Sequence, residues 1–226
     1  MPFIEIQESF GHPDIGHFLR RNEFRRVINL RSGRADYLKQ LITDLSKPRL
    51  IYRRVRIELI ENKVIHLTEG VTFSSAKLAK TLRHCEEIIC FVATIGSDVE
   101  EEIVRLTNMN RLSEAYILES LGSMMIEHTV ERFHLDSERS CTTNGSGVTL
   151  RFSPGYCDWQ ITDQKNLFLL LNSDQIGVTL TASCIMHPRK SISGVFGIFP
   201  ADNDNPILPY NPCIDCKNMN CTARRM

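Results

Sequence analysis

The most informative stretch of the chain reads Arg151-Phe152-Ser153-Pro154-Gly155-Tyr156. It closes an extended segment with a guanidinium group, a Pro-Gly turn and an aromatic ring. Arginine can donate two parallel hydrogen bonds to a carboxylate, glycine lets the backbone approach a ligand closely, and tyrosine combines an apolar ring with a hydroxyl. Two interpretations remain open: a binding loop for an amino-acid-like ligand, or a type II turn flanked by ordinary surface residues.

Further short motifs follow this turn along the chain. Residues 166–171 are expected to be helical, and the next segments read Ile176-Gly177-Val178-Thr179-Leu180-Thr181, then Ser183, Met186 and Pro188, then Ser191-Ile192-Ser193-Gly194. In this order they resemble the Arg-x-x-Pro-Gly-Tyr, Gly-x-x-Leu-Thr-x-Ser-x-x-Met-x-Pro and Ser-Val-Ser-Gly motifs of the activation domain of cobalamin-dependent methionine synthase. The resemblance spans roughly residues 91–200 and is specific between residues 151 and 194.

The resemblance implies a curved fold that binds S-adenosylmethionine in a surface groove lined by these motifs. Arg151 would then pair with the ligand carboxylate. Ser153 and Gly155 would offer backbone contacts, and Tyr156 would pack or hydrogen-bond beside the ligand. In that family the bound methyl donor remethylates an oxidised cobalamin after a flavodoxin-like partner delivers one electron.

The partners implied by the resemblance are separate proteins. The chain contains no Asp-x-His-x-x-Gly cobalamin motif, so the cobalamin is expected on a corrinoid-binding methyltransferase. A flavodoxin- or ferredoxin-like protein would be the electron donor.

Two positions depart from the family pattern. Where the family usually has an aromatic pair after Ser-Gly, this chain has Val195-Phe196, and Phe196 lacks the hydroxyl of a tyrosine. The acidic helix residue that the family places near the ligand amine has two candidates here, Glu119 and Glu127.

Strand-like patterns occur before and after the central part of the chain. Val55, Ile57 and Leu59 alternate with charged residues, which is typical of a strand exposed on one face. Residues 88–95 are a nearly unbroken apolar run that predicts a buried strand, and residues 191–199 predict the last strand.

Helical patterns occupy the middle of the chain. Ser97-Asp98-Val99-Glu100 has the form of a capping box, which predicts a long helix after it. A second long helix is predicted through Leu118 and Phe133, followed by a polar loop over residues 141–147. The order of elements favours an α+β fold with a curved antiparallel or mixed sheet and long helices over a regular βαβ alternation.

Composition divides the chain into three predicted parts. Residues 1–90 are expected to be an N-terminal α/β elaboration of the same body, and residues 91–200 its activation-domain-like core. Residues 201–226 are expected to be a Pro-rich and Cys-rich C-terminal tail.

The tail contains the pattern Cys213-x-x-Cys216-x-x-x-x-Cys221. Thiolates this close in sequence can converge on zinc or an iron-sulfur cluster, and a fourth ligand would come from elsewhere, with Cys157 and Cys184 as candidates. The alternative is a tail of reduced thiols that binds no metal.

The overall composition excludes some functional classes. Lys plus Arg equals Asp plus Glu, 27 against 27, and no basic stretch alternates with aromatic residues, so a nucleic-acid partner is not expected. No apolar run has membrane-spanning length and no secretory signal is visible, so a cytoplasmic protein without a membrane partner is expected. Neither a P-loop nor a Rossmann glycine motif is present.

These observations lead to one main hypothesis and two alternatives. The chain is expected to be a free-standing, S-adenosylmethionine-binding reactivation component for a corrinoid methyltransferase such as methionine synthase, supporting reductive methylation of oxidised cobalamin. The first alternative is a metal- or iron-sulfur-binding electron-transfer accessory of a corrinoid protein. The second is a noncatalytic docking module.

Overall fold

A seven-stranded antiparallel sheet organises the residues that the computed structural model describes, which are 4–11, 13–19, 34–201, 210–214 and 219. Its strands are β1 (Ile4–Gln7), β2 (Arg49–Glu61), β3 (Val64–Leu67), β4 (Thr72–Ser74), β5 (Glu87–Thr94), β6 (Ser146–Val148) and β9 (Ser191–Pro200). The order across the sheet is β4-β3-β2-β5-β9-β6, and β1 also pairs with β2. A separate hairpin joins β7 (Thr179–Leu180) to β8 (Met186–His187).

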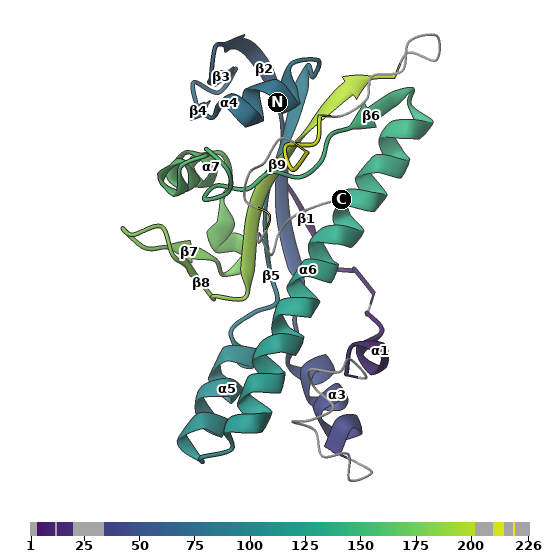
Figure 1. The fold of residues 1–226 in the computed structure, drawn as a ribbon, viewed down its shortest axis with the longest axis vertical. Coiled ribbons are helices and arrows are strands. Elements are labelled where there is room, and N and C mark those ends of the chain that lie inside the picture. Colours follow the sequence, from purple (N-terminus) through teal and green to yellow (C-terminus); the bar gives the residue numbers. More distant parts are fainter. Residues whose placement is uncertain (1–3, 12, 20–33, 202–209, 215–218, 220–226) are drawn as a thin grey trace.

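Helices cover both faces of this sheet (Figure 1). The helices that pack on one face of the sheet are α1 (Ile15–Leu19), α3 (Arg34–Leu45), α5 (Asp98–Asn108) and α6 (Leu112–Thr143). On the other face are α4 (Ala76–Leu82), α7 (Gln164–Leu170) and the short 3-10 helix η2 (Ser173–Ile176), while η1 (Ile161–Asp163) leads into α7. Figure 1 shows α6 running along the length of the molecule, with α5 packed beside its first half.

Two hydrophobic cores follow from the alternation of side chains along the central strands. In β5, Phe91 packs into the core under α6, while Cys90 and Val92 pack into the core under α4 and α7. In the adjacent strand β9, Phe196 packs into the core under α6 and Val195 packs into the core under α4 and α7. A strand buried on both faces needs a continuous apolar sequence, which is why residues 88–95 read as an unbroken apolar run.

The pattern predicted for β2 holds only in part. Val55 is buried, but Leu59 is 52% exposed. The register against β3 shifts between Ile57 and Leu59, and a shift of one residue turns the following side chains to the opposite face. Ile60 therefore packs against the core where Leu59 was expected to do so.

The capping box predicted at the start of α5 is wrong, although the helix begins where it was expected. Ser97 has helical backbone angles and its side chain makes no capping hydrogen bond. The acidic side chains at the start of α5 instead contact residues that are distant in the sequence. Lys47 Nζ lies 2.6 Å from Asp98 Oδ2. The backbone N–H of Arg189 donates to Glu100 Oε1 at 2.7 Å.

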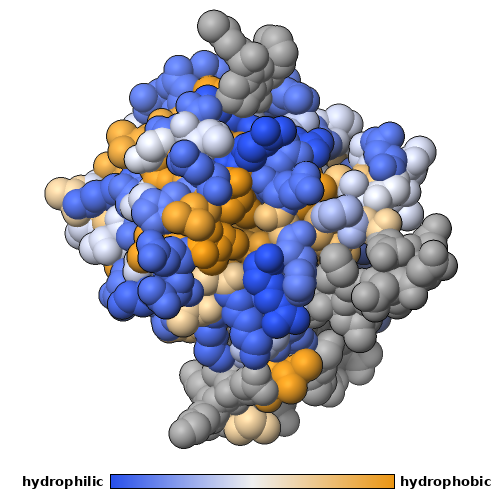
Figure 2. Space-filling model, turned by 90° about the horizontal axis from the view of Figure 1, so that it is seen from above, coloured by the Kyte–Doolittle hydropathy of each residue, from blue (hydrophilic) through white to orange (hydrophobic). Residues whose placement is uncertain are grey.

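The loop predicted over residues 141–147 is shorter than expected, because α6 continues to Thr143 and β6 begins at Ser146. The other elements agree with the sequence: the fold is α+β, with one antiparallel sheet and long helices. None of the helices in the described part of the chain combines the length and apolar composition that a membrane crossing requires. Seen from its upper end, the molecule displays an apolar strip between hydrophilic areas (Figure 2).

Candidate functional site

The stretch that begins at Arg151 is attached to the sheet at Phe152. The N–H of Phe152 donates to the carbonyl of Val195 at 2.8 Å, and the N–H of Val195 donates back to the carbonyl of Phe152 at 2.8 Å. A Cβ at Gly194 would lie 2.9 Å from the Phe152 carbonyl oxygen and 2.9 Å from Ser153 Oγ. Glycine at this position therefore lets the stretch lie directly on β9.

The Pro-Gly segment forms a tight turn. Tyr156 N–H donates to the Ser153 carbonyl at 3.3 Å, and Gly155 has a φ of +91°, which suits the third position of a type II turn. The N–H of Gly155 also donates to the carbonyl of Trp159 at 2.9 Å. The turn expected from the sequence is thus present, and it also forms one wall of a pocket.

Acidic residues after the turn fix it to α4 and β4. Asp158 Oδ1 accepts a hydrogen bond from Ser75 Oγ at 2.7 Å, and Asp158 Oδ2 accepts one from the N–H of Ala76 at 2.7 Å. Partial burial raises the pKa of Asp158, but these hydrogen bonds outweigh it and the net pKa is lowered. Asp163 Oδ2 accepts from the Ser74 N–H and from Trp159 Nε1, each at 2.9 Å.

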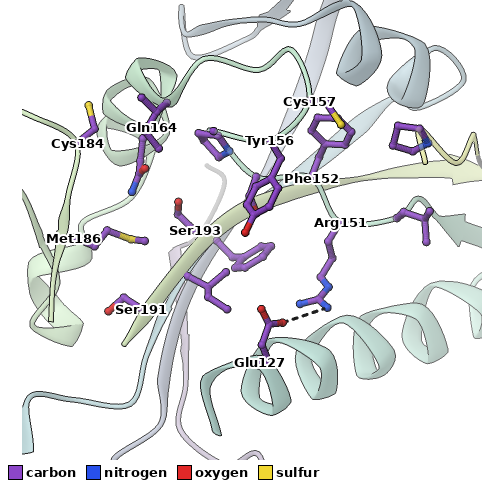
Figure 3. A pocket seen from close by; sticks show the side chains of 18 of the residues that line it. Glu127, Arg151, Phe152, Tyr156, Cys157, Gln164, Cys184, Met186, Ser191 and Ser193 are labelled. Carbon is purple, nitrogen blue, oxygen red and sulfur yellow. Dashed lines mark ion pairs between the residues drawn. The ribbon is translucent and has the colours of Figure 1, made fainter. Parts of the chain in front are cut away.

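A pocket of about 690 Å³ lies between this turn, α6, α7, the β7–β8 hairpin and the start of β9 (Figure 3). This volume is in the usual range for a small-molecule site. The four residues predicted to bind the ligand, Arg151, Ser153, Gly155 and Tyr156, all line it. The rest of the lining is mainly apolar and includes Phe91, Phe152, Ile161, Met186 and Ile192.

Arg151 and Glu127 bring opposite charges to one side of this pocket (Figure 3). The Arg151 side chain is only 11% exposed, and its Nη2 lies 2.9 Å from Glu131 Oε2 and 3.9 Å from Glu127 Oε2. Both carboxylates come from α6, one turn apart. A cation and an anion side by side in a largely apolar pocket suit a ligand that has both a carboxylate and an ammonium group.

The structure distinguishes the two acids considered from the sequence. Glu127 lines the pocket, whereas Glu119 Oε1 accepts a hydrogen bond from Lys190 Nζ at 2.7 Å. Lys190 is itself buried, so this contact connects α6 to the start of β9.

Phe196 does not line the pocket. It is fully buried on the α6 face of the sheet, with its ring centroid 5.8 Å from that of Phe133 and 4.9 Å from that of His134. Phe196, which lacks the tyrosine hydroxyl, is therefore a core residue in this chain and not part of the pocket.

Gln164 lines the pocket but was not identified from the sequence. It is the first residue of α7, it is 2% exposed, and its Nε2 has no hydrogen-bond partner among the described residues. A polar residue at the start of a helix is common, so only its position in space distinguishes it.

The tail cysteines are described only in part. Cys213 lines the pocket, whereas Cys216 and Cys221 lie outside the described residues. Lys77 Nζ donates to the Pro212 carbonyl at 3.2 Å, and Lys80 Nζ lies 4.0 Å from the centre of the Tyr210 ring, so residues 210–214 lie against α4. Within the described part of the chain, no group of three or more His, Cys, Asp or Glu is placed to hold a metal ion.

Cys85 and Cys90 are packing groups at one end of β5 and within it. Both are buried in the core under α4. Burial raises the pKa of each thiol to about 12, which keeps both protonated and unreactive near neutral pH.

The fold and the pocket define an α+β domain with a pocket of small-molecule size, whose lining carries one largely buried cation, one exposed anion and apolar walls. A sequence model of one family, described as the vitamin B12-dependent methionine synthase activation domain, matches residues 78–203. The chain belongs to this family. No curated protein sequence matches the chain.

A solved structure supports the same fold. The crystal structure of the MetH reactivation domain bound to AdoHcy matches with a TM-score of 0.57 and 14% sequence identity. The match covers 90% of this chain and 81% of that chain. At this identity the likeness establishes the fold, which is that of the methionine synthase activation domain.

Proposed function

We propose that this chain binds S-adenosylmethionine in the pocket at the Arg151 turn and supports reductive methylation of a cobalamin carried by a partner protein. The observation that carries the proposal is the placement of Arg151 and Glu127 at one side of an apolar pocket of about 690 Å³. The family membership supports it, as does the AdoHcy bound to the MetH reactivation domain.

The amino-acid end of the ligand would lie between Arg151 and Glu127. Arg151 would donate to the ligand carboxylate while Glu131 holds the guanidinium from the other side. Glu127 would accept from the ligand ammonium. Its carboxylate is 66% exposed and lies 3.9 Å from Arg151 Nη2, so it can shift toward the ligand at little cost.

The turn would hold the remainder of the ligand. The backbone at Ser153 and Gly155 lies along the pocket wall without side-chain bulk from the glycine. The Tyr156 side chain lines the pocket and the residue is 51% exposed, so its ring can cover a bound ligand from the solvent side. Phe152 and Ile192 also line the pocket and would help to exclude water.

S-adenosylmethionine, when bound, supplies an electrophilic methyl group, and the partner's cobalamin supplies the metal that receives it after a one-electron reduction. The contribution of this chain is to orient the ligand and to keep the site dry. The implied partners are a corrinoid-binding methyltransferase and a flavodoxin- or ferredoxin-like electron donor.

The test of this proposal is methyl transfer. A cobalamin-dependent methionine synthase lacking its own activation domain, with its cobalamin in the oxidised form, is mixed with this chain, a one-electron reductant and S-adenosylmethionine carrying a labelled methyl group. We expect label on the cobalamin with the wild-type chain and none with Arg151→Ala. Equal labelling by both proteins would contradict the proposal.

A second candidate function rests on Cys213. Because Cys213 lines the same pocket, an iron-sulfur cluster held by Cys213, Cys216 and Cys221 would lie next to the ligand site and could serve electron transfer, whereas a zinc ion held there would be redox-inert and structural. Iron and zinc content and the absorption spectrum of anaerobically purified protein test this, with Cys213→Ser as the variant. Corrinoid-protein binding without metal and without any dependence on S-adenosylmethionine would instead support a docking module.

A further inference from the structure

The amide of Gln164 is a buried donor without a partner in the wall of the pocket. The residue is 2% exposed, and its Nε2 makes no hydrogen bond to any described residue. Buried donors of this kind are rare in folded proteins, because each one loses its hydrogen bonds to water and gains nothing in return. Figure 3 shows the side chain directed from α7 toward the interior of the pocket.

The backbone around Gln164 cannot easily turn the side chain away. The preceding residue, Asp163, accepts hydrogen bonds from Ser74 N–H and Trp159 Nε1. Two residues further on, Asn166 Nδ2 donates to the Thr72 carbonyl at 3.0 Å, and Leu167 is fully buried. The first turn of α7 is thus held from both sides, which preorganises the amide for a ligand.

Gln164 and Arg151 lie on different sides of the pocket. In Figure 3 Arg151 extends toward Glu127 on α6, whereas Gln164 approaches from the side of α7 and the β7–β8 hairpin. If the amino-acid end of the ligand is at Arg151, the group that reaches α7 is the nucleoside. A nucleoside carries several hydrogen-bond acceptors, on the purine ring and on the ribose, that an amide N–H can meet.

We propose that Gln164 is a specificity-determining residue whose Nε2 donates a hydrogen bond to the nucleoside half of S-adenosylmethionine. This inference rests on the proposed function, since it takes the ligand orientation from Arg151 and Glu127. Gln164 would recognise the nucleoside of the ligand, whereas Arg151 and Glu127 would recognise its amino-acid end.

The first test compares Gln164→Met with the control Gln160→Met, which changes an exposed glutamine outside the pocket lining. Dissociation constants for S-adenosylhomocysteine and thermal unfolding without ligand are measured for both. We expect Gln164→Met to bind about 5- to 20-fold more weakly, as the loss of one hydrogen bond implies, while its unfolding temperature stays equal or rises. Methionine fills similar space and leaves no unpaired donor, so a purely structural glutamine would instead lower the unfolding temperature and leave affinity unchanged.

The second test identifies the acceptor. Analogues of S-adenosylhomocysteine that lack one purine ring nitrogen or one ribose hydroxyl are bound to wild type and to Gln164→Met. The analogue that lacks the true acceptor should bind both proteins equally, which assigns the contact to the base or to the sugar. If every analogue discriminates the two proteins as strongly as the parent ligand does, the inference is wrong.

The two proposals fail in different ways. Wild-type protein that does not bind S-adenosylhomocysteine at all would overturn the proposed function and this inference with it. Wild-type binding that is lost in Arg151→Ala but unchanged in Gln164→Met would overturn the inference alone.

Discussion

Arg151 reaches from the turn to α6, where its Nη2 lies 2.9 Å from Oε2 of Glu131. The Arg151 side chain is 11% exposed and lines the pocket, whereas the Glu131 side chain is 55% exposed and is not part of the pocket lining. Glu131 therefore positions Arg151 rather than neutralising it completely.

This relationship predicts the effect of Glu131→Gln. We expect the affinity for S-adenosylmethionine to fall about 3- to 10-fold, because the guanidinium would lose its orienting partner, with a change in stability below about 0.5 kcal/mol. Glu138→Gln, an exposed change further along α6, serves as the control. A rise in affinity would show that Glu131 competes with the ligand for Arg151.

Gly194→Ala should damage the site through the backbone. The new methyl group would lie 2.9 Å from the Phe152 carbonyl oxygen and from Phe91 Cζ, so the turn would move away from β9. We expect a loss of about 1–3 kcal/mol of unfolding free energy together with weaker ligand binding.

A matched control for this substitution lies on the same strand. A Cβ at Gly197 would lie 2.4 Å from Cys85 Sγ, which is a clash in the core away from the pocket. Gly197→Ala should lower stability but leave the affinity of the folded protein unchanged. Equal effects of both variants on affinity would argue against the placement of the turn on β9.

His134 predicts a pH dependence of stability. Burial is the main reason that its pKa lies below the ordinary value of a histidine, and Nε2 is 2.9 Å from the Thr149 carbonyl oxygen. The unfolded chain then binds the proton more readily than the folded chain, so stability is fully present above about pH 6.5 and is lost as the pH falls through the folded pKa. Chemical unfolding between pH 7 and pH 5 should show a smaller loss for His134→Gln than for wild type. Identical pH profiles would rule out this contribution.

Ser75 couples the turn to α4. Its Oγ accepts the Leu78 N–H at 3.0 Å as the cap of α4 and donates to Asp158 at 2.7 Å. Ser75→Ala should cost about 1 kcal/mol of stability. Because Asp158 also depends on Ser75, the effects of Ser75→Ala and Asp158→Asn should not be additive. Additive losses in denaturant unfolding would show that the two residues act independently.

The parts of the fold that were predictable are those set by local pattern. The apolar run of β5 and the final strand β9 are visible in the sequence because both strands are buried on two faces. Leu59 was misplaced because a register shift depends on the partner strand. The acids after Ser97 resemble a capping box, but Lys47 and Arg189, distant in sequence, bind them instead.

The residues of the candidate site were predictable only where they belong to a recognisable sequence motif. Arg151, Ser153, Gly155 and Tyr156 came from one contiguous stretch, and all four line one pocket. No sequence pattern shows that Glu119 binds Lys190, so the structure was needed to choose between Glu119 and Glu127 as the acid of the pocket. The roles of the predicted ligand and metal residues, and the division at residues 90 and 200, remain predictions.

Calorimetric binding of S-adenosylmethionine to anaerobically purified wild type and Arg151→Ala tests the central claim most directly, with iron and zinc measured in the same samples. The proposed function predicts binding to wild type and a large loss of binding in Arg151→Ala, while the metal content of the two proteins stays the same. Absence of binding to folded wild-type protein, or equal binding to both proteins, would contradict it.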